Sequence, residues 1–216
     1  SGLQVVFEAG VFIAATWLSG VLGQIYQAAN QIALSIATLT FMIANGMSVV
    51  AMIRVGNYKG MEDYISLRRV AISIFLFILL TQVVLGGLIG LLRYQLPEFF
   101  LNTEKLDTVD NIALVIGESA HLLLIAALFQ IVDGLQTVAL GALRGLQDAK
   151  IPMILSFISY WVIAFPICYY LGLHTSLKTT GIWIGLLVGL AFSALLQTTR
   201  FLILSNRLIR NNQTKN

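Results

Sequence analysis

The sequence predicts an all-α polytopic membrane protein in which six transmembrane helices form a single bundle. Of its 216 residues, 58% are hydrophobic and 11% are charged, whereas a soluble domain carries about 25% charged residues. The mean hydropathy is +0.87, and long uncharged runs alternate with short charged clusters. A soluble enzyme is excluded, because a domain of this size cannot enclose so much apolar surface.

The first two helices share one uncharged run of 45 residues between Glu8 and Arg54. A single crossing needs about 20 residues, so this run is long enough for two spans and a tight turn. Glycine, glutamine and asparagine gather between residues 20 and 30, and such residues favour a turn. We therefore expect helices at about 3–22 and 30–54.

The third and fourth helices are separated by a polar segment. The uncharged stretch predicts a third span at 70–92, and the acidic segment 93–110 predicts a solvated loop. Apolar residues then resume and predict a fourth helix at 112–143, with two acids inside it. This helix is either tilted or longer than the membrane is thick.

The fifth and sixth helices are expected at 152–173 and 180–204, followed by a polar tail. Pro152 suits the first turn of a helix, where no backbone donor is lost. Pro166 lies inside the fifth span and should kink it unless neighbouring groups satisfy the freed carbonyl.

Lysine and arginine predict the orientation of these six helices, because cytoplasmic loops carry the excess of positive charge. Ten of the 13 basic residues fall on the side that holds both chain ends. We therefore expect an integral membrane protein with both ends of this segment in the cytoplasm. The basic residues serve orientation in the bilayer and are not clustered as a nucleic-acid partner requires. The ten are Arg54, Lys59, Arg68, Arg69, Arg144, Lys150, Arg200, Arg207, Arg210 and Lys215; the other three are Arg93, Lys105 and Lys178.

Small residues at four-residue spacing predict close contacts between helix backbones in lipid. The pattern occurs as Gly181, Gly185 and Gly189, as Gly86 and Gly90, and as Gly141 and Gly145.

Motifs for enzymatic chemistry are missing from the sequence. The chain has one cysteine and two widely separated histidines, which excludes an intrachain disulfide and a cysteine-based metal site. It contains no Walker loop, His-Glu-x-x-His, Gly-x-Ser-x-Gly or dinucleotide glycine motif. We expect no enzyme activity and no cofactor, so energy for transport would come from an ion gradient.

Carboxylates inside the predicted spans are the main functional candidates, because each costs about 2.5–3.5 kcal/mol to insert. Glu8, Glu118 and Asp133 qualify. Glu118, Asp133 and Gln136 fall within about 60° on one helix face. Glu118 lies near the outer rim, where an interfacial carboxylate is the better interpretation.

Glu8 and Asp133 lie at depths that differ by about one helical turn, so they could face one cavity. Two carboxylates in such a site would share a cation, with Na+ as the candidate, or one of the two would keep a proton. The alternative is two unrelated acids that bond to neighbouring helices. Residues that could line the cavity or join helices are Gln31, Phe41, Asn45, Phe129, Gln130 and Gln136.

Three segments resemble the multidrug and toxic compound extrusion (MATE) family. Residues 129–153 resemble the tenth transmembrane helix and following loop of that family, and the segments that start at Val5 and Ala29 resemble the seventh and eighth helices. The most specific motifs are Asp-Gly-x-Gln from Asp133, Leu-Arg-Gly-x-x-Asp beyond it, and the Arg-Val-Gly that starts at Arg54.

The resemblance implies that this chain is the C-terminal six-helix lobe of a twelve-helix transporter. Members of the family alternate between outward-open and inward-open states, and exchange cationic or amphipathic drugs for Na+ or H+. Glu8 and Asp133 match the coupling carboxylates. The chain starts at Ser1 without a methionine, so we expect a fragment that needs the N-terminal half as partner and does not transport alone.

The sequence departs from the family pattern in its hydroxyl groups. Some members carry a tyrosine one turn before the tenth-helix aspartate, where this chain has Phe129, and Phe41 likewise offers no hydroxyl. The choice between Na+ and H+ therefore stays open. Two other functions also remain: a lipid-linked saccharide flippase of a related fold, and a non-transporting membrane scaffold subunit.

Overall fold

The computed structural model describes residues 2–100 and 109–213, and within them every regular element is a helix. This confirms the predicted all-α class. The elements are α1 (Gly2–Val21), α2 (Gln24–Gly60), α3 (Tyr64–Leu91), α4 (Leu96–Phe100), α5 (Val109–Gly145), α6 (Lys150–Phe157), the π-helix η1 (Ile158–Ala164), α7 (Phe165–Leu173) and α8 (Lys178–Gln213).

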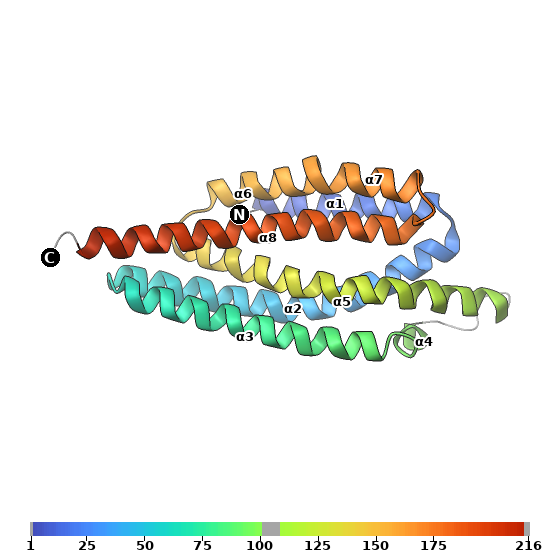
Figure 1. Cartoon of the computed structure of the whole chain (residues 1–216), viewed down its shortest axis with the longest axis horizontal. Coiled ribbons are helices and arrows are strands. Elements are labelled where there is room, and N and C mark those ends of the chain that lie inside the picture. Colours follow the sequence, from blue (N-terminus) through green and yellow to red (C-terminus); the bar gives the residue numbers. More distant parts are fainter. Residues whose placement is uncertain (1, 101–108, 214–216) are drawn as a thin grey trace.

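The long helices run side by side as one bundle with α5 at its centre (Figure 1). Helix α5 packs against α2, α3 and α8. On the other side of α8, the continuous rod of α6, η1 and α7 packs against α8 and α1. Side chains from the first and fifth predicted spans reach the fourth, which carries Asp133, through hydrogen bonds to Gln136.

Within residues 2–100 and 109–213, five helical segments are long and apolar enough to cross a membrane. They correspond to the second to sixth predicted spans. The first predicted span, 3–22, forms α1, whose apolar part Val6–Val21 is shorter than the other five. The five segments are Gln24–Gly60, Tyr64–Leu91, Ile112–Gly145, Lys150–Leu173 and Lys178–Gln213.

The structure corrects several predicted boundaries. The first turn is much shorter than residues 20–30, because α2 already begins at Gln24 and Gly23 makes the turn with a φ of 123°, a region that glycine adopts without strain. Helix α8 continues beyond residue 204 into the polar tail. Part of the loop predicted at 93–110 is helical, as α4 and the start of α5, while residues 101–108 lie outside the described chain.

Pro166 is accommodated by a change of helix type. The seven residues of η1 immediately precede α7, which has Pro166 in its first turn. The Phe165 N–H donates to the Tyr160 carbonyl, five residues earlier. This wider turn is a local adjustment expected for proline within a membrane helix. Such π-helical segments often occur at functional sites.

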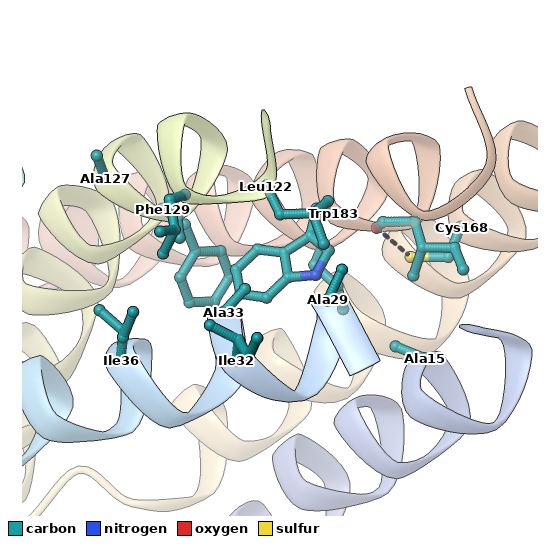
Figure 2. Close-up of a cluster of buried hydrophobic side chains, with 14 of the residues drawn as sticks. Ala15, Ala29, Ile32, Ala33, Ile36, Leu122, Ala127, Phe129, Cys168 and Trp183 are labelled. Carbon is teal, nitrogen blue, oxygen red and sulfur yellow. Dashed lines mark hydrogen bonds between the residues drawn. The ribbon is translucent and has the colours of Figure 1, made fainter. Parts of the chain in front are cut away.

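Buried side chains form two apolar clusters, one toward each end of the bundle. In the first, the Phe129 and Trp183 rings meet edge to face with 5.6 Å between their centres, and small residues of α2 lie beneath them (Figure 2). Trp183 Nε1 donates to Asn30 Oδ1 over 2.9 Å. The second cluster gathers around Leu67, Ile78 and Phe201 and joins α2, α3, α5 and α8.

Two of the three glycine patterns lie at close helix contacts, as predicted. Gly185 faces the backbone of Cys168 in α7, and Gly141 faces the backbone of Ser48 in α2, so neither site has space for a Cβ atom. In the third pattern, Gly86 contacts α5, but a Cβ at Gly90 would meet nothing.

Basic residues gather at one end of the bundle, which we call the basic end and define by residues 54–69, 144–150 and 200–213. Hydrogen bonds join these segments: Lys59 Nζ donates to the Leu146 carbonyl over 2.8 Å, and Arg200 pairs with Asp148. The three segments of the basic end are therefore connected to one another by side-chain contacts.

Candidate functional site

Glu8 of α1 and Asp133 of α5 belong to one site. Both are half-buried, and their carboxyl groups interact electrostatically. Gln136, one helical turn beyond Asp133, donates from Nε2 to Glu8 Oε1 over 3.2 Å. Glu8 therefore lies about one turn along α5 from Asp133, toward the basic end.

Tyr160 adds a hydroxyl group to this site from the π-helical segment η1. Its hydroxyl donates to Gln136 Oε1 over 2.8 Å, and the side chain is only 2% exposed. Tyr160 also interacts electrostatically with both Glu8 and Asp133. Although Phe129 supplies no hydroxyl in the helix of Asp133, Tyr160 brings one to the same site from another helix.

A second set of hydrogen bonds reaches the same oxygen of Glu8 through Gln4. Gln4 Nε2 lies 3.4 Å from Glu8 Oε1 and 3.3 Å from Ser156 Oγ. Ser156 in turn accepts from Gln197 Nε2 over 3.0 Å. The Glu8 carboxylate is thus linked to α5, α6 and α8, so its charge state can influence several helices.

Arg144 places one positive charge close to Glu8. Its Nη2 donates to Gln4 Oε1 over 3.3 Å, and its guanidinium interacts electrostatically with Glu8. The Arg144 Nε is buried without a hydrogen-bond partner. The site therefore combines two carboxyl groups, one guanidinium and neutral amide and hydroxyl groups.

This arrangement is suited to binding one cation or proton reversibly. Hard cations prefer oxygen ligands, and Glu8, Asp133, Gln136 and Tyr160 all carry oxygen here. Over the described residues there is no group of three or more His, Cys, Asp or Glu side chains that could hold a metal ion. A cation at this site would thus depend on neutral oxygens as well as on the two acids.

The other predicted cavity residues lie elsewhere. Phe129 and Gln130 belong to the packed interior, because Phe129 lies between Phe12 and Trp183 and Gln130 Nε2 donates to a backbone carbonyl of α3. Gln31, Phe41 and Asn45 are exposed on α2, so they could face a partner or lipid.

Glu118 lines a separate outer groove of about 440 Å³ at the end opposite the basic end. Lys178 Nζ lies there 4.5 Å from the centre of the Tyr26 ring and interacts electrostatically with Glu118. This position fits the interpretation of Glu118 as an interfacial carboxylate.

Sequence reasoning missed several members of the site. Four of them are single polar residues in apolar spans, and that pattern was the available signal; the fifth, Arg144, directly follows the predicted fourth span. Their contact with Glu8 depends on helix rotations that the sequence does not define. The missed residues are Gln4, Arg144, Ser156, Tyr160 and Gln197.

Comparison with known proteins places the chain in one family. The family model MatE matches residues 1–170. The chain is 43% identical over 174 residues to "Probable multidrug resistance protein NorM" of Rhodopseudomonas palustris, covering 81% of the chain and 36% of that protein. It is 40% identical over 203 residues to "Multidrug resistance protein NorM" of Burkholderia vietnamiensis, covering 94% and 43%.

Solved structures show the same fold at low sequence identity. A MATE structure in the bent conformation matches 97% of this chain and 44% of its own, with a TM-score of 0.84 and 15% identity. The eukaryotic MATE transporter AtDTX14 matches 99% and 46%, with a TM-score of 0.80 and 18% identity. The chain spans less than half the length of each of these proteins.

Proposed function

This chain belongs to the MatE family, and we propose that it acts as the C-terminal half of a secondary active multidrug antiporter. The complete transporter would exchange cationic or amphipathic drugs for Na+ or H+. The observation that carries this proposal is the linked pair of Glu8 and Asp133, because two acids within membrane spans mark an ion pathway by default. The names of the NorM relatives support the drug-efflux class.

The coupling step follows from the bonds around Gln136. When Glu8 and Asp133 are both charged, they repel each other, and a shared cation or a proton on one of them relieves this repulsion. Gln136 lies between the Tyr160 hydroxyl and Glu8. A change at Glu8 is therefore transmitted to α5 and η1, and cation binding shifts the population toward one access state.

Drug and cation would compete through these access states without contacting each other. A state that binds the cation better becomes more populated as the cation concentration rises. Release of the cation then favours the opposite state, which accepts the drug. The second half of the antiporter would supply the other wall of the drug cleft, with exposed α2 residues such as Phe41 facing it.

A chimeric transporter tests this proposal. The chain would replace the matched segment of the Burkholderia vietnamiensis relative, and cells that lack efflux pumps would be assayed for accumulation of a fluorescent cationic dye. Glu8→Gln and Asp133→Asn should abolish efflux at equal membrane abundance. Glu118→Gln, on the same helix as Asp133 but in the outer groove, is the matched control and should keep efflux.

The outcomes separate the competing functions. Undiminished dye efflux by Asp133→Asn would contradict a coupling role for this carboxylate. If the unsubstituted chimera excludes no dye but moves a lipid-linked saccharide, the flippase function is favoured. Reduced abundance or altered oligomerisation without any transport phenotype would favour the scaffold function.

A further inference from the structure

A groove of about 390 Å³ opens on the basic end, between the start of α3 and the end of α8. We propose that it binds the phosphate of an anionic diacyl phospholipid, whose acyl chains continue along the exposed face of α3. This inference needs only insertion in a membrane and does not depend on antiport. The groove is lined by Ile65, Arg68, Arg69, Ile72, Ser73 and Ile209.

Two guanidinium groups give the groove its charge. Arg68 Nη1 donates to Asn206 Oδ1, so its side chain is held across the gap between α3 and α8. Arg69 is exposed on the next position of α3. The planar guanidinium fork matches two phosphate oxygens at once. Both forks line the same groove, so one phosphate group there would have two guanidinium partners.

The polar groups near these arginines leave them available for an anion. The residues that line the groove include no acid. Asp63 interacts electrostatically with Arg69, but its Oδ1 already accepts from the Ser66 N–H over 3.0 Å. The Ser73 hydroxyl, which also lines the groove, donates to the Arg69 carbonyl over 3.0 Å.

An apolar track leads away from Arg69. Residues at spacings of three and four share one face of a helix, and Arg69, Ile72, Leu76 and Leu80 follow that spacing along α3. The three apolar side chains are exposed. On the neighbouring helix, Ile203 is exposed as well. A free phosphate ion would make no use of this track, whereas acyl chains would cover it.

The depth of the groove also fits a lipid headgroup. Arg69 directly precedes Val70, where the uncharged part of α3 begins. Its guanidinium therefore lies where the hydrocarbon meets the headgroups, and basic pockets between helices on the cytoplasmic side are suited to anionic lipids.

The test uses the 216-residue chain, purified in detergent and titrated with lipid. Native mass spectrometry would compare phosphatidylglycerol with phosphatidylcholine, and inorganic phosphate would be added as a competitor. We expect phosphatidylglycerol to bind about tenfold more tightly, as a charge-assisted contact can provide. Millimolar inorganic phosphate should not displace it.

Two variants and one control locate the site. Arg68→Gln with Arg69→Gln should weaken phosphatidylglycerol binding about tenfold. Arg69→Gln alone leaves the bond between Arg68 and Asn206 in place, so it tests the site without disturbing helix pairing and should weaken binding by about threefold. The control combines Arg54→Gln with Arg207→Gln, which removes the same charge from exposed positions outside the groove.

Three results would overturn the proposal. They are equal binding of the two lipids, equal losses in the control and the Arg68/Arg69 variant, and displacement of the lipid by inorganic phosphate. Equal losses in the control and the Arg68/Arg69 variant would indicate a general attraction of the lipid to a basic surface. Displacement by inorganic phosphate would indicate that the groove is a site for a free anion. Because none of these readouts involves drug efflux, failure here would leave the proposed function untouched.

Discussion

Removing the Tyr160 hydroxyl tests whether the hydrogen bonds around Glu8 are structurally important. In Tyr160→Phe, Gln136 keeps its bond to Glu8 but its Oε1 loses the donor that lies 2.8 Å away. Gln136 is only 2% exposed, so solvent cannot replace that donor. The substitution therefore leaves a buried acceptor without a partner.

The expected magnitude follows from this burial. An unsatisfied buried acceptor costs about 1–3 kcal/mol, and hydrogen bonds between membrane helices contribute up to about 1.7 kcal/mol. We expect a loss of about 1–2 kcal/mol in the free energy of unfolding. For a chain of this length, this corresponds to a fall of about 2–8 °C in melting temperature.

Thermal unfolding in detergent measures the effect. Tyr169→Phe is the control, because Tyr169 lies in α7 with its side chain 47% exposed. The control should melt within about 1 °C of the unsubstituted chain. If Tyr160→Phe melts at the same temperature as the control, the Tyr160 hydroxyl does not stabilise Gln136 and the description of this site is wrong.

Two further predictions concern packing and helix capping. Gly185→Ala should destabilise the chain by about 1–3 kcal/mol, because the added methyl group would press on the backbone of α7. Gly87→Ala, at an open position of α3, should be neutral or stabilising by up to about 1 kcal/mol. Similar melting temperatures for the Gly185→Ala and Gly87→Ala variants would contradict the close contact between α7 and α8 at Gly185. Hydrogen bonds from Ser66 hold the pKa of Asp63 below its usual value. The charged Asp63 side chain therefore stabilises α3 fully at pH values above the unfolded pKa of about 3.9. This stabilisation is lost as the pH falls through the lower pKa of the folded state. Asp63→Ala should therefore lower the melting temperature at pH 7 but not well below pH 3.9, and a penalty independent of pH would show that the charge of Asp63 is not the cause.

The sequence was sufficient to find the acids but not all of their partners. Glu8 and Asp133 stand out because charge is costly within an apolar span, and the helical period places Gln136 beside Asp133. Tyr160 could not be assigned, because a tyrosine in an apolar helix gives no sign of which neighbour its hydroxyl meets. The π-helix before Pro166 also rotates the residues of this segment relative to an ordinary α-helix.

The turn between the first two helices shows a different limit. Polar residues between 20 and 30 predict a loop, yet α2 includes most of them. For Asn30 the reason is a tertiary contact, because its side chain is buried and accepts a hydrogen bond from Trp183 Nε1. A polar residue that joins helices and a polar residue in a turn have the same composition, and only the tertiary partner distinguishes them.

The most direct test of the proposed function is ion movement driven by drug. The chimera described above would be reconstituted in vesicles loaded with Na+ or buffered to one pH, and a cationic drug would be added to one side. Antiport predicts that the drug drives Na+ or H+ across the membrane in the opposite direction, and that Asp133→Asn abolishes this movement. Drug uptake with no countermovement of either cation, or countermovement that Asp133→Asn preserves, would contradict coupling through Glu8 and Asp133.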